Sequence, residues 1–380
     1  MPLRFQDGKD GGSVTRLPVE SGICMKENLR VGPYEFLNPL GSGGQGSVWL
    51  ATDTRNGVKV AIKVLPPGTW GAIELARLRR ESRLLLTFSD PGLPAGIGVI
   101  EDGTQRVYGF VMQYVEGIAL HQALRERILS PKEIALIGCE LARILSVLHA
   151  RGVVHRDVKM ANVVLRPGWE TGSPGTIVLV DLGIARGLES NAATAYTAPG
   201  SLVGSAPYVA PELLFFTGEI GPSCAVDVFS LGVLIWLLLF RKHPTGLPMS
   251  ADFQEFLDKY RGGSFVVPDP QRAEEVQASV PGLLPVLYRS LEFSLSRRYI
   301  SAMQVHEALL AVMGRPSQRP APVTLDMDVK APLPAPTVDM AALVIPPMQK
   351  PSKWKTVAIV AVGFVVIAAA TTLGVIWVWR

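Results

Sequence analysis

The segment HRDVKMAN at residues 155–162 constrains what this chain can fold into more than any other feature. It brings a carboxylate, an ammonium group and an amide together, in Asp157, Lys159 and Asn162. A helix is predicted just before it, over 135–152, and a strand just after it, so the segment should be a loop held at both ends. Transfer of a phosphoryl group needs positioning and charge neutralisation more than covalent help, and these groups can supply both. A random polar turn is the alternative, but it leaves the two flanking elements unexplained.

A second carboxylate is predicted to face the same loop. Asp181 directly follows the apolar segment TIVLV at 176–180, which is typical of a buried strand. Magnesium ions that bridge phosphate oxygens prefer oxygen ligands. Asn162 and Asp181 are therefore the predicted metal ligands.

A glycine-rich turn over Gly41–Val48, with the sequence GSGGQGSV, could lie close against phosphate groups because glycine adds no side chain there. The turn alone is a weak signal. A dinucleotide-binding turn is its main competitor and would be followed by a helix, whereas the segment SVWLATD at 47–53 alternates like a strand.

Lys63 lies on the next predicted strand, 58–65. A lone lysine on a strand is often only a surface residue, but one that follows a glycine-rich hairpin can reach the α and β phosphates of a nucleotide. It then needs a carboxylate to hold it in place. The amphipathic helix predicted over 71–86 offers Glu81, and Glu74, two turns earlier, is the alternative.

The order of the predicted elements indicates a domain of the α+β class followed by a tail. Residues 1–33 form a polar leader. Strands predominate from 34 to about 116 and helices from about 117 to 313, which predicts a small sheet-rich lobe and a larger helical lobe. A proline-rich linker at 314–355 then leads to an apolar segment at 356–379.

The apolar segment at 356–379 is predicted to be a single transmembrane helix. It has no charged residue and is long enough to cross a hydrocarbon core about 30 Å thick. Tryptophans stand at both ends of the segment, where the membrane interface favours them. Three lysines precede the segment and one arginine follows it, and this excess of positive charge predicts that the preceding domain lies on the cytoplasmic side. A cleaved lipid-anchor signal is the alternative, but that route needs an N-terminal export signal, and the polar first residues do not resemble one.

Two further apolar features bear on the membrane. The run that ends at Phe240 is too short for a second span and is predicted to be a buried core helix. Within the predicted span, Gly363, Ala370 and Gly374 fall near one helical face, which raises the hypothesis of a homodimer, with generic composition as the alternative. Because almost no sequence follows Trp379, we expect no external sensor module.

Charge and cysteine usage exclude other classes of protein. The formal charge of +4 and the lack of a lysine and arginine block argue against a nucleic-acid partner. The three cysteines, Cys24, Cys139 and Cys224, lie too far apart for a disulfide framework or a metal knuckle. They are predicted to be free thiols in a reducing compartment.

These motifs, in this order and spacing, resemble the eukaryotic-type (Hanks-type) Ser/Thr protein kinases, and most closely the bacterial form. The resemblance runs from about Tyr34 to about Met313. It implies a bilobal protein-kinase-like fold, ATP and Mg²⁺ as cofactors with Mn²⁺ as an alternative metal, and protein substrates that offer Ser or Thr. With the predicted span, it implies a single-pass protein of the bacterial inner membrane.

The resemblance also implies a role for each motif residue. Asp157 is the expected proton acceptor and Lys159 its neighbour in the Ser/Thr-specific pattern, while Lys63 and Glu81 form the expected ion pair. Met112 is the expected gatekeeper, and Gln113 to Val115 the hinge that pairs with adenine. The residues expected to contact ATP are Leu40, Gly41, Ser42, Gly43, Gly44, Gln45, Gly46, Val48, Ala61, Lys63, Met112, Gln113 and Val115.

The segment from Asp181 to Glu212 resembles an activation loop, because it ends in Ala210-Pro211-Glu212 and contains several hydroxyl residues. In the family, an arginine placed like Arg156 often pairs with a phosphorylated residue of this loop. The resemblance therefore implies autophosphorylation at one or more of Thr194, Thr197 and Ser201. It also implies that Asp227 is a buried structural aspartate and that Arg298 pairs with Glu212.

Three departures from the family pattern are visible. Leu182 replaces a phenylalanine after the metal-binding aspartate, and Gln113 replaces an acidic hinge residue. Ser294 stands near the place of an acidic residue, which could loosen the helical lobe. A membrane-tethered pseudokinase is the main alternative function, although all four catalytic groups are present, and a small-molecule kinase of the same fold is a second.

Overall fold

The computed structural model describes residues 27–43, 46–65, 79, 82–83, 86–105, 107–181, 206–215, 223–251, 253–262, 265 and 267–314. The chain divides into two units, Met1–Pro332 and Leu333–Arg380, and all described residues lie in the first. Several predictions therefore fall outside the described residues. They concern Gly44, Gln45, Glu81, Leu182, the hydroxyl residues of the activation loop, the linker and the transmembrane helix.

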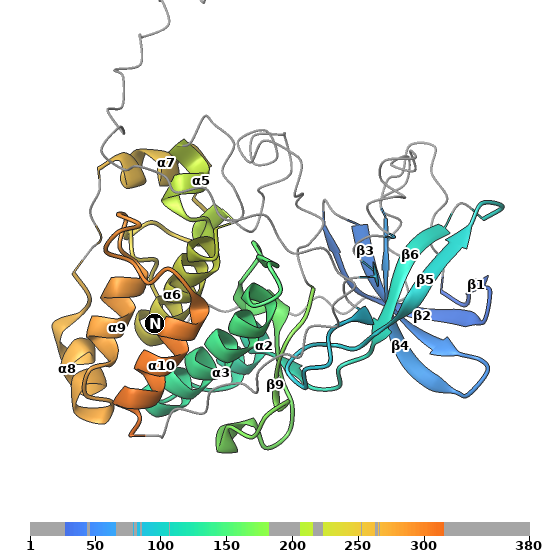
Figure 1. Ribbon diagram of the computed structural model, residues 1–380, viewed down its shortest axis with the longest axis horizontal. Coiled ribbons are helices and arrows are strands. Elements are labelled where there is room, and N and C mark those ends of the chain that lie inside the picture. The colour runs from blue at the N-terminus through green and yellow to red at the C-terminus, as the bar shows by residue number, and fades with distance from the viewer. Residues whose placement is uncertain are drawn as a thin grey trace, which may run out of the picture. The chain divides into compact units, whose positions relative to one another are not determined.

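The N-terminal lobe is built on one antiparallel sheet of six strands (Figure 1). The strands lie in the order β1-β2-β3-β4-β6-β5. The inward-facing side chains of successive strands meet in one apolar cluster that includes Phe36, Ile62 and Val111, as the period of two along a strand requires. The bounds are β1 Arg30–Val31, β2 Tyr34–Gly43, β3 Gly46–Asp53, β4 Val58–Val64, β5 Gly96–Asp102 and β6 Val107–Gln113.

The sheet begins earlier than we predicted. Residues up to 33 were expected to be leader, but Arg30–Val31 forms strand β1 and pairs with Tyr34 and Glu35 of β2. Val31 is buried, at 2% exposure, so it belongs to the core of the lobe. A strand of two residues is too short to show an alternating pattern in the sequence, which explains the error.

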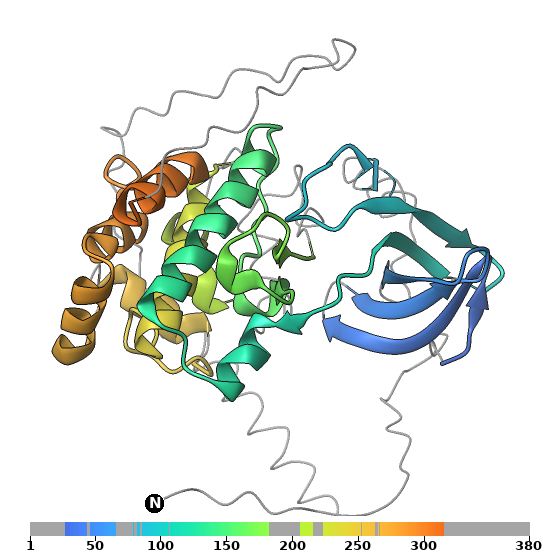
Figure 2. The ribbon, with the colours of Figure 1, turned by 90° about the horizontal axis from the view of Figure 1, so that it is seen from below.

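The C-terminal lobe is mainly helical. Its first long helix, α3, begins sharply because Ser130 and Glu133 form a capping box and Pro131 occupies the first helical turn. In Figures 1 and 2, α3 lies beside α10, and the two helices are in contact. The helices are α2 Leu120–Glu126, α3 Pro131–His149, α5 Pro211–Phe215, α6 Ala225–Phe240, α7 Phe253–Arg261, α8 Pro270–Ser279, α9 Leu283–Ser290 and α10 Ala302–Val312.

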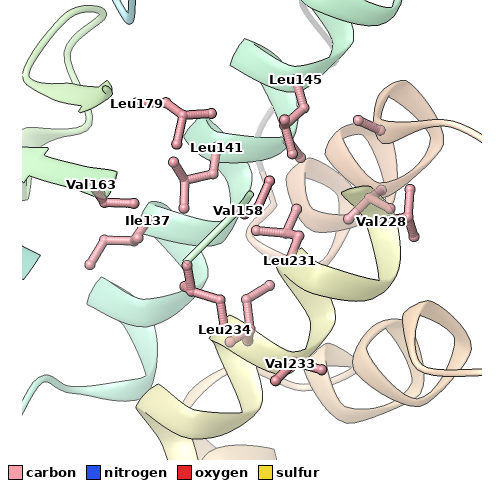
Figure 3. Packing of buried hydrophobic residues seen from close by; sticks show 14 of the residues in the cluster. Ile137, Leu141, Leu145, Val158, Val163, Leu179, Val228, Leu231, Val233 and Leu234 are labelled. Carbon is pink, nitrogen blue, oxygen red and sulfur yellow. The ribbon is translucent and has the colours of Figure 1, made fainter. Parts of the chain in front are cut away.

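Helix α6 is the centre of this lobe. Every residue from Ala225 to Leu239 is buried, which confirms the prediction of a core helix ending at Phe240. A helix that is apolar on all sides is stable only when other elements surround it. Figure 3 shows side chains of α6, such as Leu231 and Leu234, directed toward Leu141 of α3 and toward Val158.

A second sheet has three strands, and the last two of them lie in the chain between the loop that leaves α3 and the activation segment. Its strands are β7 Ile118–Ala119, β8 Val163–Leu165 and β9 Ile177–Leu179, in that order. One-turn 3₁₀ helices occur at Met160–Asn162, Trp169–Thr171 and Ala206–Tyr208. Across the described ranges, no helix combines the length and hydropathy that a membrane span requires, and the predicted span lies outside them. Of the three cysteines, Cys24 lies outside the described residues, Cys139 and Cys224 form no disulfide bond within them, and Cys139 Sγ lies 3.4 Å from His306 Nδ1.

Candidate active site

The loop between α3 and β8 brings together the three groups that the sequence singled out. Lys159 Nζ lies 2.8 Å from Asp157 Oδ2, and Asn162 Nδ2 lies 3.1 Å from the same oxygen. Asn162 Nδ2 also donates to the Asp157 carbonyl oxygen at 2.8 Å. Asp157 and Asn162 are both buried, so the carboxylate is held in one orientation by charge-assisted hydrogen bonds.

Asp227 holds the start of this loop. Its two carboxylate oxygens accept the backbone N–H groups of His155 and Arg156, both at 2.7 Å. The resemblance implied a buried structural aspartate here, and Asp227 is fully buried. The loop is thus tied to the first turn of α6, in the middle of the lobe.

His149, at the end of α3, was not singled out from the sequence and is the third partner of Asp227. Its Nε2 lies 2.9 Å from Asp227 Oδ2. Burial alone would lower the pKa of His149, but the hydrogen bond to Asp227, with smaller contributions from Cys224, raises that pKa to about 9. Burial would likewise raise the pKa of Asp227, but His149 holds it below its ordinary value. The pair is ionised at neutral pH.

Two residues of the site have left-handed backbone conformations. The φ angles are 62° at Arg156 and 56° at Asp181. Such angles are uncommon outside glycine, and they persist where the surrounding contacts determine them. At Arg156 the surrounding contact is the bond from its own N–H group to Asp227.

Lys63 joins the two lobes at Asp181. Its ammonium group on β4 forms an ion pair with the Asp181 carboxylate, which lies just beyond β9. Burial alone would raise the pKa of Asp181, but Lys63 more than offsets it and holds the pKa below its ordinary value. The carboxylate is therefore ionised. The predicted pairing of Lys63 with Glu81 stays a prediction, because Glu81 lies outside the described residues.

Asn162 and Asp181 fit the expected Mg²⁺ site. The Val180 N–H group donates to the Asn162 carbonyl oxygen at 2.8 Å, so the two ligand residues lie on adjoining segments. The Asn162 amide nitrogen donates hydrogen bonds to Asp157, so the Asn162 oxygen Oδ1 is the atom that could bind a cation. Within the described residues no three His, Cys, Asp or Glu side chains form a metal site by themselves. A hard cation here would need phosphate or water oxygens to complete its coordination.

Several of the described residues that are expected to contact ATP lie on paired strands of the six-stranded sheet. Gly41 pairs with Val48 across the glycine-rich hairpin, and Val48 pairs with Lys63 on the next strand. Gly46 has a φ of 118°, and a Cβ atom there would overlap the Val64 carbonyl oxygen, so only glycine fits. This close approach explains why a glycine occupies position 46.

Met112, the expected gatekeeper, and Gln113, the first expected hinge residue, lie at the end of β6. Met112 pairs with Ala61 across β4 and β6, and both side chains are buried. They share one apolar cluster with Leu165 and Val163 of the helical lobe, and Val48 packs against that cluster. Gln113 ends β6 and Val115 follows it. The contacts with adenine themselves stay a prediction.

The predicted pairing of Arg298 with Glu212 is confirmed. The guanidinium donates two hydrogen bonds to the carboxylate, at 2.6 and 3.0 Å. Further bonds go to the carbonyl oxygens of Glu292, Phe293 and Ala225. Ser294, which stands near the place of the usual acidic residue, bonds Ser296 instead. Three backbone carbonyl oxygens thus add hydrogen bonds to those that Arg298 makes with Glu212.

Tyr208 is a second residue that sequence reasoning missed. Its carbonyl oxygen accepts from Ser230 Oγ at 2.8 Å, and its phenol group bonds to the backbone of Met160. Burial raises the pKa of Tyr208 to about 12, so the phenol stays protonated. Tyr208 thereby links the end of the activation segment to the catalytic loop. An isolated tyrosine in a turn gives no signal of such a contact.

Comparison with known proteins bears on the family of the chain. The sequence model of the protein kinase domain matches residues 34–302. The serine/threonine-protein kinase PknA of Mycobacterium tuberculosis is 30% identical over 306 residues, which are 77% of this chain and 65% of PknA. The serine/threonine-protein kinase pkn2 of Myxococcus xanthus is 31% identical over 283 residues, which are 74% of this chain and 32% of pkn2. The chain thus spans about one third to two thirds of the length of these relatives.

The fold agrees as well. Two crystal structures of the PknI kinase domain from Mycobacterium tuberculosis match with TM-scores of 0.54 and 0.55 at 23% identity. The matches cover 76% and 77% of this chain and 99% and 100% of the PknI chains. At this identity the likeness shows the fold alone, which is the bilobal arrangement of a sheet-rich and a helical lobe. Because the family match covers well over half of the sequence, the chain belongs to the protein kinase family.

Proposed function

We propose that the chain is an ATP-dependent Ser/Thr protein kinase that transfers the γ-phosphoryl group to Ser and Thr hydroxyls of proteins. The observation that carries the proposal is the loop in which Lys159 and Asn162 both bind Asp157 Oδ2, at 2.8 and 3.1 Å. A carboxylate so held can accept the proton of a hydroxyl nucleophile, and the ammonium group beside it can neutralise the phosphoryl group in transfer.

The other site residues would act on the nucleotide. Lys63 would hold the α and β phosphates, and Asn162 and Asp181 would hold a divalent cation. Such a cation, when bound, neutralises the charge that develops on the phosphate oxygens. Since Lys63 and Asp181 now contact each other, a nucleotide would replace that direct ion pair with contacts to its own phosphates.

Nucleotide binding and transfer together test these roles. We expect Asp181→Asn to raise the Mg²⁺ concentration needed for half-maximal transfer, because one anionic ligand is lost. Lys63→Met should weaken ATP binding. Lys59→Met is the matched control, because Lys59 lies four residues earlier on the same strand and is exposed. Equal binding and equal Mg²⁺ dependence in all three variants would contradict the assigned roles.

Autophosphorylation of the activation segment is a further part of the proposal. Arg156 directly precedes Asp157, and its backbone is held in a fixed left-handed conformation. A phosphate on Thr194, Thr197 or Ser201 could pair with this arginine and order the segment. Mass spectrometry after incubation with Mg-ATP should find phosphate on at least one of the three, and none in Asp157→Asn. A segment that stays unmodified would contradict this part.

We also propose that residues 356–379 anchor the protein in the membrane with the kinase domain in the cytoplasm. The support is the uncharged apolar sequence with lysines before it. The full chain should remain with membranes after an alkaline wash, whereas a chain ending at Lys355 should be released. Release of both chains would contradict the membrane anchor.

A homodimer through the helical face that contains Gly374 is a separate proposal. Crosslinking of the full chain should decrease in Gly374→Ile, and unchanged crosslinking would refute the homodimer.

A further inference from the structure

An ion-pair cluster outside the active site joins a turn of the N-terminal lobe to helix α3. Arg143 of α3 donates two hydrogen bonds to Asp90, from Nη1 at 2.7 Å and from Nη2 at 2.8 Å. It also binds Glu140 on its own helix, with Nε 3.0 Å from both carboxylate oxygens. The Arg143 and Asp90 side chains are only 19% and 10% exposed. A bidentate pair that is this well buried fixes geometry far better than a surface pair.

Asp90 holds the turn that follows it. The Gly92 N–H group donates to Asp90 Oδ1 at 2.8 Å, and the Leu93 N–H group donates to the Asp90 carbonyl oxygen at 3.0 Å. A Cβ atom on Gly92 would lie 2.5 Å from Ile144 of α3, so the turn rests directly on that helix. Burial alone would raise the pKa of Asp90, but Arg143 holds it below its ordinary value. The pair is therefore ionised at neutral pH.

The same turn binds both halves of the candidate ATP site. The Gly92 carbonyl oxygen accepts the N–H group of Leu179 at 2.9 Å, two residues before Asp181. The Ala95 carbonyl oxygen accepts the N–H group of Gln113 at 2.8 Å, at the start of the hinge. A shift of the turn would therefore move the metal-binding carboxylate and the hinge together.

The segment just before the turn is held by a second arginine. Arg151 Nη1 donates to the Thr87 carbonyl oxygen at 2.6 Å, and its guanidinium lies 4.7 Å from the centre of the Phe88 ring. These contacts orient the chain that enters the turn. They do not reach Gly92 or Ala95, whose carbonyl groups make the bonds to the site. Asp90 supplies the ion pair that ties this turn to α3.

We propose that Arg143 and Asp90 are positioning residues for nucleotide binding, which set the distance between the hinge at Gln113 and the metal ligand Asp181. This inference rests on the proposed roles of Gln113 and Asp181. Misplacing reacting groups by about 1 Å can cost up to about 10²-fold in rate. Since neither positioning residue touches the nucleotide, their loss should weaken binding while leaving some transfer at saturating ATP.

The test compares variants that each remove the charge of one partner of the Asp90–Arg143 ion pair. Asp90→Asn keeps an oxygen for the Gly92 N–H group but removes the anion, and Arg143→Met removes the cation. Each should raise the dissociation constant of Mg-ATP by about fivefold or more. Arg143→Lys, which keeps the charge and can make one of the two bonds, should recover part of the affinity.

Glu140→Gln is the matched control. It removes a carboxylate that also binds Arg143, at 2.9 to 3.0 Å, but Glu140 belongs to α3, and among the described residues its side-chain hydrogen bonds go to Arg143 and not to the turn. Its unfolding temperature should fall by about as much as that of Asp90→Asn, while its affinity for Mg-ATP stays within about twofold of wild type. This separation of affinity from stability is what a merely structural pair would not produce.

Different outcomes would contradict the positioning role and the proposed kinase function. Unchanged Mg-ATP affinity in Asp90→Asn and Arg143→Met, or an equal loss in Glu140→Gln, would overturn the positioning role even if wild-type transfer is normal. A wild-type protein that binds Mg-ATP but phosphorylates no protein would contradict the proposed function and leave the affinity comparison valid. If Arg143→Met does not fold, Asp90→Asn and Arg143→Lys still give the comparison.

Discussion

Replacing Asp227 by asparagine removes the anion on which the catalytic loop rests. In the native protein its oxygens accept two backbone N–H groups at 2.7 Å and lie 2.9 Å from His149. Asparagine has one acceptor oxygen for the two N–H groups and presents an NH₂ group where the second oxygen stood. One buried N–H group is left without an acceptor, and the protonated His149 is left without its anion.

The size of the effect follows from these losses. An unsatisfied buried N–H group costs about 1–3 kcal/mol, and breaking one partner of a buried ion pair costs about 3–5 kcal/mol. The two losses overlap because they share one carboxylate, so we expect the free energy of unfolding to fall by about 3–5 kcal/mol in total. For a domain of this size each kcal/mol lowers Tm by about 2–4 °C, which gives a decrease of about 10 °C.

Activity should fall further than stability alone requires. The N–H group of Arg156 would lose its anchor, and the left-handed conformation of that residue, with a φ of 62°, would no longer be held. Asp157 follows directly, so transfer should fall by up to about 10²-fold at temperatures where the variant is folded.

The assay is urea unfolding together with phosphotransfer, for Asp227→Asn and for the control Asp258→Asn. Asp258 forms an exposed ion pair with Arg261 on α7, so its loss should change stability by less than about 0.5 kcal/mol. A stability loss below about 1 kcal/mol in Asp227→Asn, with normal transfer, would refute the role assigned to this carboxylate.

Three further predictions concern other residues. Burial lowers the pKa of His243 to about 4, and the neutral ring accepts from the Thr245 N–H group while bonding to the Pro207 carbonyl oxygen. In the unfolded chain this histidine binds a proton near pH 6.5. The free energy of unfolding should therefore fall by about 3 kcal/mol as the pH is lowered from 6.5 to 4, as unfolding titrations would show. In His243→Gln this part of the pH dependence should be absent. Gly46→Ala should raise the KM for ATP severalfold, whereas Gly98→Ala on β5, where an added Cβ meets no described atom within 4 Å, should change it little. Arg298→Met, which leaves Glu212 buried without a cation, should lower the unfolding free energy by about 3–5 kcal/mol in denaturant titrations.

The parts of the site that lie close together in the sequence could be predicted from it. Asp157, Lys159 and Asn162 fall within six residues, so their spacing alone places them in one loop. The long helices could be predicted because their apolar periodicity extends over several turns. For the same reason β1, with two residues, and the short polar helix α8 were missed.

Contacts between distant segments could not be predicted from local sequence patterns, and the Arg298–Glu212 pair was expected only from the resemblance. Lys63 and Asp181 are separated by 118 positions, and His149 and Asp227 by 78. No local pattern reports such pairs, because they depend on how the strands and helices pack. The pairing of Arg143 with Asp90 is of the same kind, since an arginine on a helix surface usually only covers that surface.

The most direct test of the central claim is phosphotransfer by Asp157→Asn. The variant keeps a side chain of the same shape near Lys159 and Asn162 but removes the carboxylate that would accept the proton. Purified wild-type chain with Mg-ATP should label a protein substrate on Ser or Thr, and the variant should lose transfer by at least about 10²-fold while its circular dichroism spectrum and Mg-ATP affinity remain. Full transfer by a folded Asp157→Asn variant would contradict the account.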